Sequence, residues 1–255
     1  MISANSSIES TYRGEITLIF HGGLTHFFKS KDDPLETHFL LREKTSLKHI
    51  VEALGVPHPE IGIITVNQTI INLTYHPLPG DIIHIYPWQN EKSTYEEQSP
   101  KFILDNHLGK LTVYLRLLGI DACYNHNFED ADIARIAAEQ NRIVLTRDRG
   151  LLKRKVVQSG YCVRGDDPIT QLAEVVQKFN LSPHLKPFSR CPRCNGLLEK
   201  VDKQTILDQL LPLTRLYYND FSRCSQCKQI YWKGSHYDRI KPIIQRFAVI
   251  NDEET

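Results

Sequence analysis

The fold is decided by residues 101–148, which read KFILDNHLGKLTVYLRLLGIDACYNHNFEDADIARIAAEQNRIVLTRD. Apolar runs at 101–104, 120–124 and 143–146 predict three short buried strands. Between them, an apolar stripe closed by Gly119 predicts a helix over 107–118, and a segment led by acidic residues predicts another over 131–140. Strands that are separated by helices predict an α/β fold with a parallel sheet and right-handed crossovers.

The same alternation continues towards the C-terminal side of this stretch. Residues 161–164 predict a fourth strand, and Pro168 to Phe179 predict a further helix. In sheets of this kind, binding and catalytic sites form beyond the carboxyl ends of the strands. The residues that follow each strand are therefore the ones to search for chemistry.

Aspartates follow three of these predicted strands. Asp105 follows the first, Asp148 the third, and Asp166 and Asp167 the fourth, while Asp130 lies near the start of the second helix. Carboxylates that converge repel one another unless a cation lies between them, and hard oxygen ligands suit Mg²⁺ or Mn²⁺. We expect Asp105 and Asp148 to bind that ion, with Asp130 and Asp167 completing the catalytic set. The competing interpretation is that each caps a helix or a turn, and Asp166 stays an alternative to Asp167.

Basic residues surround the third of these strand ends. Five of the nine residues from Arg147 to Lys155 are Lys or Arg, and such a cluster beside a carboxylate cleft would hold a nucleic-acid backbone. A solvated helix face is the alternative interpretation, and Arg116 has the same ambiguity. The candidate RNA-binding side chains are these basic residues and two that follow the second cysteine pair. They are Arg116, Arg147, Arg149, Lys153, Trp232 and Lys233.

Four of the six cysteines form two Cys-x-x-Cys pairs, Cys191 with Cys194 and Cys224 with Cys227. This spacing predicts a structural Zn²⁺ site with four thiolate ligands and no open position. The separation of the pairs indicates an insertion at Ile206–Tyr218. After the second pair, Trp232 and Lys233 lie in the sequence IYWKGSH, where they either stack on RNA bases or pack the ribbon onto its neighbour.

The N-terminal segment, from about Arg13 to Trp88, has a different pattern. It predicts strands at 15–20, 38–42, 63–66 and 81–86 and a helix over 46–54, an α+β order. Its LPGDIIHIYP stretch resembles the ubiquitin-like β-grasp of small sulfur-carrier proteins. Those carriers end in a free Gly-Gly, whereas this chain continues through Pro87 and Trp88 into a polar linker at 90–100. We therefore expect a module that positions substrate or docks a protein partner rather than a sulfur carrier.

Charge is distributed unevenly along the chain. Residues 1–99 hold 7 Lys or Arg against 12 Asp or Glu, and residues 186–255 hold 12 against 8. A polyanionic partner is therefore expected towards the C-terminal side. No apolar run approaches the length that spans a bilayer, and Met1 to Tyr12 lacks an apolar signal core. We expect a cytoplasmic protein without a membrane partner.

The stretches of sequence that carry a family resemblance are Asp105, LGKL, YLRLLGIDACY, Asp130, IVLTRDRGLLKR, SRCPRCNG, and CSQC with YWKGSH. Through them, the sequence resembles the Mut-seven-C ribonuclease family. These are PIN-like domains with a zinc ribbon, often preceded by a ubiquitin-like domain. The resemblance implies a ribonuclease with an acidic, Mg²⁺- or Mn²⁺-dependent site. Asp105, Asp130 and Asp148 match the family's acidic positions, and Asp166 and Asp167 match a fourth only loosely.

The expected organisation has three domains: a ubiquitin-like β-grasp domain at 1–92, a PIN-like nuclease domain at 100–185 and a Cys₄ zinc ribbon at 186–255. The expected function is hydrolysis of RNA, with tRNA as one candidate. The alternative function is a non-catalytic RNA- or tRNA-binding adaptor that uses the ribbon and the basic loop. A sulfur-transfer partner is a third possibility, which the missing Gly-Gly end opposes. Acids at several strand ends favour the enzyme, because clustered negative charge weakens RNA binding.

Overall fold

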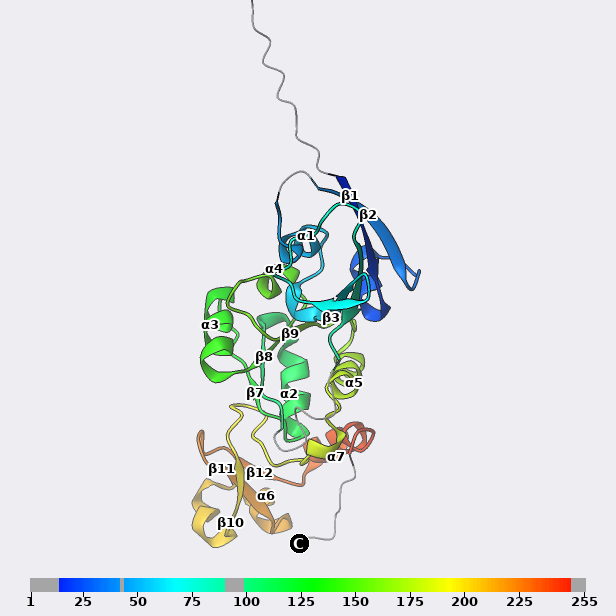
Figure 1. Cartoon of the computed structure of the whole chain (residues 1–255). Helices are drawn as coiled ribbons and strands as arrows, with labels where there is room; N and C mark the ends of the chain where they lie inside the picture. Colours follow the sequence, from blue (N-terminus) through cyan, green and yellow to red (C-terminus); the bar gives the residue numbers. More distant parts are fainter. Residues whose placement is uncertain (1–13, 42–43, 90–98, 249–255) are drawn as a thin grey trace, which may run out of the picture. The chain divides into compact units, whose positions relative to one another are not determined.

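The computed structural model describes residues 14–41, 44–89 and 99–248. They divide into two compact units (Figure 1). The first comprises the N-terminal residues up to Gln89 together with Asp148–Lys155, and the second comprises the remainder. No helix in these described ranges has both the length and the apolar character needed to cross a membrane.

The first unit is built on one five-stranded sheet with the order β2-β1-β5-β3-β4. The strands are β1 (Gly14–Phe20), β2 (Leu35–Leu41), β3 (Ile61–Val66), β4 (Thr69–Ile71) and β5 (Ile82–Pro87). β1 runs parallel to β5, and the remaining pairs are antiparallel. Helix α1 (Leu47–Ala53) packs its apolar side into the core, and short 3₁₀ turns lie at Gly22–Phe28 and His58–Glu60. This is the ubiquitin-like β-grasp arrangement that the sequence predicted.

Local signals account for these elements. In β1, Ile16, Leu18 and Phe20 are buried on alternate positions, as expected of a strand with one face on the core. Ser46 accepts a hydrogen bond from the His49 amide at the start of α1, and Gly55 follows its end with φ of +101°. These two residues bound the helix that was predicted over 46–54.

The predicted strand at 38–42 begins earlier, at Leu35, and its last residue lies outside the described ranges, as does most of the predicted linker. Strand β4 was not predicted. This strand forms through a tight turn in which Asn67 and Gln68 have φ of +47° and +72°. Such left-handed pairs join short antiparallel strands.

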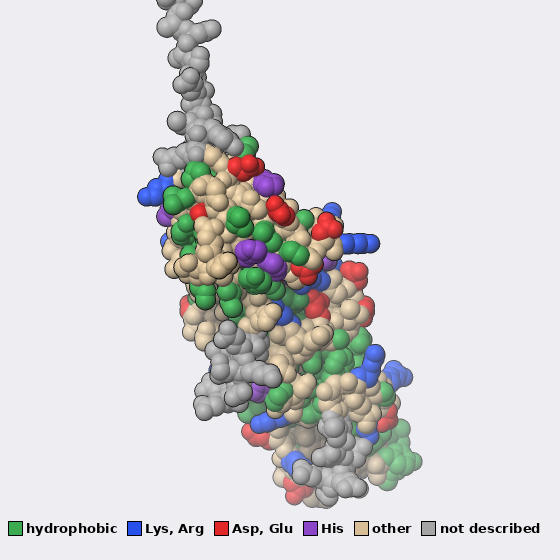
Figure 2. Space-filling model, turned by 45° about the vertical axis from the view of Figure 1, so that its right-hand side comes forward, with side chains coloured by type: hydrophobic (Ala, Val, Ile, Leu, Met, Phe, Trp, Pro, Cys, Tyr) green, Lys and Arg blue, Asp and Glu red, His purple; other side chains and the backbone are tan. Residues whose placement is uncertain are grey.

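The outer face of this sheet carries aromatic and apolar side chains. Ile82 and Tyr86 are exposed and His84 is half-buried, while Ile83 and Ile85 between them are buried. His21 stacks on Tyr86 with ring centroids 4.2 Å apart, and its Nε2 lies 3.0 Å from Nδ1 of His84. Burial and the neighbouring His84 lower the pKa of His21. Figure 2 shows histidines among hydrophobic side chains on this unit.

The second unit contains a parallel sheet with the order β7-β6-β8-β9. Its strands are β6 (Phe102–Leu104), β7 (Ala122–Cys123), β8 (Ile143–Thr146) and β9 (Gly160–Cys162). Every residue of β6 and β8 is buried, as expected when helices cover both faces. Helix α2 (Gly109–Leu117) packs against α5 (Pro168–Lys178), while α3 (Asp130–Gln140) contacts β6 and β8.

Several predicted elements of this unit differ in extent, among them the fourth strand, which was predicted over 161–164 and is Gly160–Cys162. The helix predicted over 107–118 divides into a 3₁₀ turn at Asn106–Leu108 followed by α2, and β7 is shorter than the predicted 120–124. Gly119 ends α2 with φ of +86°, and a side chain there would meet the carbonyl group of Lys186. Glycine is therefore required both for the backbone angle and for the close approach of the chain that leads into the ribbon.

The ribbon is a three-stranded antiparallel sheet of β10 (Leu198–Val201), β11 (Phe221–Cys224) and β12 (Ile230–Trp232). The predicted insertion lies between β10 and β11 as a 3₁₀ segment, Lys203–Gln209, and helix α6 (Pro212–Tyr217). Buried Ile206, Leu210, Phe221 and Ile230 give the ribbon a small core. Helix α7 (Ser235–Ile244) follows and was not predicted.

Candidate active site and metal centre

The parallel sheet brings predicted acidic residues to one edge. Asp105 directly follows β6, and Asp166 and Asp167 lie between β9 and α5. Asp130 is the first residue of α3, which follows β7 and leads back to β8, so the start of α3 lies at the carboxyl edge as well. Asp148 follows the end of β8, separated from it by Arg147.

Asp105 is the buried member of this set, with 4% of its surface exposed. One carboxylate oxygen accepts hydrogen bonds from the hydroxyl of Thr146 and, at 3.3 Å, from the amide of Arg147. The other accepts from the amide of His107 at 2.8 Å. The β6–β8 register, which pairs Leu104 with Leu145, brings these groups together. Thr146 was missed in the sequence, although its place before Arg147 and Asp148 in LTRD was the available signal.

Several of the other acidic residues accept hydrogen bonds from backbone amides at the first turns of helices. Glu129 and Asp132 are the acidic neighbours of Asp130. Asp132 accepts a hydrogen bond from the Glu129 amide at 3.4 Å, so these two neighbours stabilise the first turn of α3. Asp148 accepts from the Gly150 amide at 2.7 Å and caps the short helix α4 (Arg149–Leu152). Capping is compatible with a second partner, because a carboxylate has about four acceptor positions.

Of the two acids after β9, Asp167 caps α5. It accepts hydrogen bonds from the amides of Ile169 and Thr170 and from the Thr170 hydroxyl. The hydrogen bond from that hydroxyl is the main reason that the pKa of Asp167 is lowered, with the Thr170 amide next. Asp166 is exposed and forms an ion pair with Arg147 at 3.1 Å. Asp166 and Asp167 thus already have different partners.

The carboxylates supply the hard oxygen atoms that Mg²⁺ and Mn²⁺ prefer. Within the described ranges, however, only one group of three or more acidic, cysteine or histidine side chains is close enough to hold a metal ion. It is the set of four cysteines, whose ligand atoms all lie within 4.8 Å of one another. The carboxylate oxygens at the sheet edge are therefore of the kind that binds a divalent cation. In this structure they accept hydrogen bonds from N–H and O–H groups of the protein. Asp105 in particular uses both of its oxygens.

The predicted RNA-binding residues of the basic loop have specific contacts. In the first unit, the Arg149 guanidinium lies 4.9 Å from the ring centroid of Phe27 and donates to the Phe27 carbonyl at 3.2 Å. Lys153 donates to the Glu52 carbonyl at 2.7 Å. In the second unit, Arg147 is exposed and pairs with Asp166. Of these three cations, Arg147 lies next to the acidic edge with its guanidinium at the surface.

Arg116 was predicted to bind RNA, but its side chain is engaged inside the protein. Its side chain is only 4% exposed, and its guanidinium donates to the carbonyls of Ala122, Pro192 and Arg193 at 2.8–3.1 Å. Burial lowers the pKa of Arg116, and the neighbouring Cys123 and Cys194 offset only part of this effect. Arg116 therefore holds the first Cys-x-x-Cys turn against the sheet. The sequence lacked a signal for this because the contacts span more than 70 residues.

The four cysteines meet as predicted. The Sγ atoms of Cys191 and Cys227 lie 3.7 Å apart, and those of Cys194 and Cys224 lie 3.4 Å apart. Ligands at about 2.3 Å from a tetrahedral Zn²⁺ are separated by about 3.8 Å, so the cluster fits this ion. Cys123 and Cys162 stay outside the cluster, in β7 and β9.

The cysteine thiols of the cluster differ in their pKa values. Burial raises the pKa of Cys194 to about 12, whereas for Cys224 backbone amides outweigh burial and lower the pKa to about 7. Burial also raises the pKa of Tyr231, whose hydroxyl lies 3.0 Å from Sγ of Cys191. Tyr231 therefore stays protonated and can donate to a thiolate. Four thiolates in this volume would repel one another without a bound cation.

The ribbon is joined to the sheet by a second polar contact. Asn195, in a left-handed conformation within the first cysteine turn, accepts from the Ala122 amide and donates to Asp121 at 2.8 Å. Asp121 also pairs with Arg142 at 2.6 Å and with Arg190 at 3.7 Å. Although burial opposes this, the hydrogen bonds from Arg142 and Asn195 lower the pKa of Asp121. Asp121 is thus held by structural contacts to Arg142, Arg190 and Asn195.

The remaining predicted RNA-binding residues, Trp232 and Lys233, are exposed and line a cavity of about 640 Å³ beside the ribbon. They are the two predicted RNA contacts that share a cavity with other aromatic and basic side chains.

Comparison with known families matches residues 100–244 to the Mut7-C RNAse domain and residues 14–93 to the Mut7-C ubiquitin domain. The first match alone covers more than half of the chain. No curated protein and no solved structure matches the sequence. The two family matches confirm the resemblance seen in the sequence.

Proposed function

Because the chain belongs to the Mut7-C RNAse family, we propose that it hydrolyses RNA phosphodiester bonds at the carboxyl edge of the β6–β9 sheet. The observation that carries this proposal is Asp105, a buried carboxylate at the end of β6 that is oriented by Thr146 and by two backbone amides. A buried carboxylate that is held in one orientation at the carboxyl end of a parallel strand suits a catalytic role better than a structural one.

We propose that Asp105 and Asp148 hold Mg²⁺ or Mn²⁺, with Asp130 and either Asp166 or Asp167 assisting. When bound, such an ion lowers the pKa of its water and offsets the negative charge of the scissile phosphate. The protein orients the site: Thr146 and the His107 amide fix the Asp105 carboxylate. Arg147 would exchange its ion pair with Asp166 for an RNA phosphate.

The four-cysteine cluster is proposed to hold one structural Zn²⁺. The protein partner proposed for the β-grasp domain would use the outer face of its sheet, where Ile82 and Tyr86 are exposed. For the domain limits we retain 1–92, 100–185 and 186–255, and a cytoplasmic location is likewise proposed.

Cleavage of a mixed RNA pool by the full-length protein tests the nuclease. The protein is freed of weakly bound divalent ions by dialysis, and Mg²⁺ or Mn²⁺ is then added back. We expect Asp105→Asn and Asp148→Asn each to lower the cleavage rate by about 100-fold, because each removes a ligand charge. Asp208→Asn, an exposed acid of the ribbon insertion, is the matched control and should cleave at the wild-type rate.

The same assay assigns the fourth acid. Asp167→Ser keeps a hydroxyl that can cap α5 but removes the charge, and Asp166→Asn removes the charge of the other candidate. The variant with the larger loss of cleavage, at unchanged thermal stability, identifies the residue. Equal cleavage by the wild type and by an Asp105→Asn/Asp148→Asn double variant would mean that a contaminating nuclease is responsible.

The alternative, a non-catalytic RNA-binding adaptor, is favoured by one observation, the aromatic and basic cavity of the ribbon. It predicts RNA binding without cleavage under any divalent ion. It also predicts that Trp232→Ala weakens binding, while Asp105→Asn has little effect on it.

A further inference from the structure

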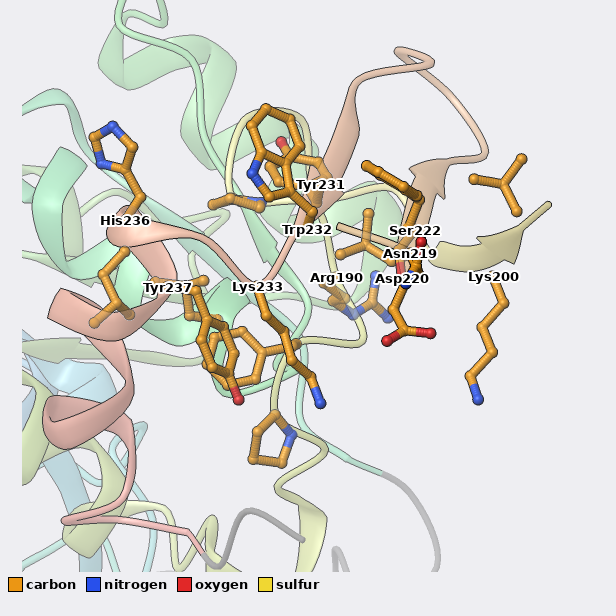
Figure 3. Close-up of a pocket in the computed structure, with 18 residues that line it drawn as sticks. Arg190, Lys200, Asn219, Asp220, Ser222, Tyr231, Trp232, Lys233, His236 and Tyr237 are labelled. Carbon is orange, nitrogen blue, oxygen red and sulfur yellow. The ribbon is translucent and has the colours of Figure 1, made fainter. Parts of the chain in front are cut away.

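A cavity of the second unit lies beside the ribbon, and none of the strand-end aspartates lines it. It has a volume of about 640 Å³ and is lined by β10, β11, β12, α7 and the segment around Phe188 (Figure 3). A volume of this size is typical of small-molecule sites and accommodates one nucleotide. The nuclease residues proposed above do not contribute to its wall.

Aromatic side chains form much of this wall. Trp232 is 37% exposed and is packed by Phe221 and Tyr218, each with its ring centroid 6.3 Å away. Gly234 makes this position possible, because a Cβ there would lie 2.7 Å from the indole nitrogen. On the α7 side, Tyr237 contacts Phe188 at a centroid distance of 4.8 Å. Trp232 and Tyr237 are therefore supported aromatic surfaces rather than loose side chains.

Cations surround the same cavity. Lys200 and Lys233 are exposed on its rim, and His236 lies at the start of α7. Arg190 is also part of the wall but is bound to Asp121 and to the carbonyls of Gly119 and Asn195. Asp220 is the one acid among the lining residues. Figure 3 shows Tyr237 and His236 on one side of the cavity and Lys200 and Ser222 on the other.

We propose that this cavity binds one unstacked base of single-stranded RNA against Trp232, with the adjoining phosphates held by Lys233 and Lys200. Supported aromatic faces beside lysines are the arrangement by which proteins hold single-stranded RNA. An apolar protein segment would not use these lysines. The inference rests on the proposed function only in that the ligand is RNA, and it makes the ribbon the element that anchors the substrate.

Binding is measured on the full-length protein without cleavage. The chain has two tryptophans, so Trp88→Phe leaves Trp232 as the single fluorophore, and Asp105→Asn keeps the RNA intact. The probe is an octauridylate, added without divalent ions. We expect saturable quenching of Trp232. By fluorescence anisotropy of labelled octauridylate, Trp232→Ala should raise Kd about tenfold, while Trp232→Phe should retain most of the affinity.

The lysines are tested by substitutions that leave the fold intact. Lys233→Gln and Lys200→Gln should each weaken binding and lower the salt dependence of log Kd by about one phosphate contact. Arg239→Gln, which removes an exposed cation of α7 outside the cavity, should bind within twofold of the parent. Unquenched Trp232 emission, or equal affinities for the lysine variants and the control, would overturn the proposal.

A separate cleavage assay keeps the two proposals apart. Quenching and weakened binding by the cavity variants, with no cleavage under any divalent ion, would reject the nuclease and keep the base site. Cleavage together with unchanged binding by the cavity variants would reject the base site alone.

Discussion

Arg116 shows how a single buried charge can join two parts of a unit. Its guanidinium reaches the carbonyl of Ala122 in β7 and the carbonyls of Pro192 and Arg193 in the first cysteine turn. Only a long side chain with several forked donors can satisfy three carbonyls from one position. The first cysteine turn and the edge of the sheet are therefore held in one arrangement.

Replacement of this arginine tests that role. Arg116→Met keeps most of the length but leaves three carbonyls without their donor, so the free energy of unfolding should fall by about 3 kcal/mol. Urea unfolding of the zinc-loaded protein measures the change. Arg193→Met, a substitution at an exposed position of the same turn, is the control and should be near neutral. Unchanged stability combined with weaker RNA binding would restore the role first predicted from the sequence.

At the residue scale, the sequence predicted which acids lie at strand ends but not which partners they have. The rule that sites form at carboxyl ends of parallel strands was enough to select Asp105, because that rule depends only on strand order. Thr146 and Arg116 were different. Their roles depend on the β6–β8 register and on contacts across more than 70 residues, neither of which a local pattern carries.

At the scale of elements, the ribbon has a small core of its own. Four buried side chains, Ile206, Leu210, Phe221 and Ile230, form this core. A core of this size is too small to stabilise a fold alone, so we expect the ribbon to depend also on an ion bound by its four cysteines and on Arg116 and Asn195.

Removal of zinc should therefore unfold the ribbon before the parallel sheet. A structural zinc site of this kind contributes on the order of 10 kcal/mol to local folding. Cys194→Ser, or treatment with a strong chelator, should release the metal and change the emission of Trp232, while amide exchange in β6 and β8 stays slow. Cys123→Ser, outside the cluster, should keep the metal. Protein that contains no zinc when purified without chelator would contradict this prediction.

Two elements, β4 and α7, were missed for different reasons. β4 has three residues and forms only through its turn, so it shows no periodic pattern. Helix α7 contains Pro242, which argues against a helix in the sequence. By contrast, β8 lies where predicted because its continuous apolar run is buried on both faces.

At the scale of the whole molecule, the sequence predicted the order of β-grasp, nuclease and ribbon. It did not indicate that Asp148–Lys155 groups with the N-terminal residues. In that unit, Arg149 contacts Phe27 and Lys153 donates to Glu52. Two cations first assigned to RNA are thus bound to protein carbonyls and a ring, and charge patterning alone does not distinguish these uses.

Deletion of residues 1–95 tests this organisation. The second unit has its own sheet and ribbon, so the shortened protein should stay soluble, keep its zinc and keep any cleavage activity. Without Phe27 and Glu52, residues 149–155 lose hydrogen-bond acceptors that hold them. Trypsin should therefore cleave after Arg149 and Lys153 faster than in the full-length chain, as followed by mass spectrometry.

Cleavage after Lys200, an exposed ribbon lysine, is the internal control, because its rate should not change with the deletion. Local opening governs proteolysis when the folded state recloses quickly, so the ratio of the two rates reports the stability that the contacts give to this segment. Equal ratios in the two proteins would mean that residues 149–155 do not depend on the N-terminal contacts. Insolubility of the shortened chain would show instead that the second unit needs the first in order to fold.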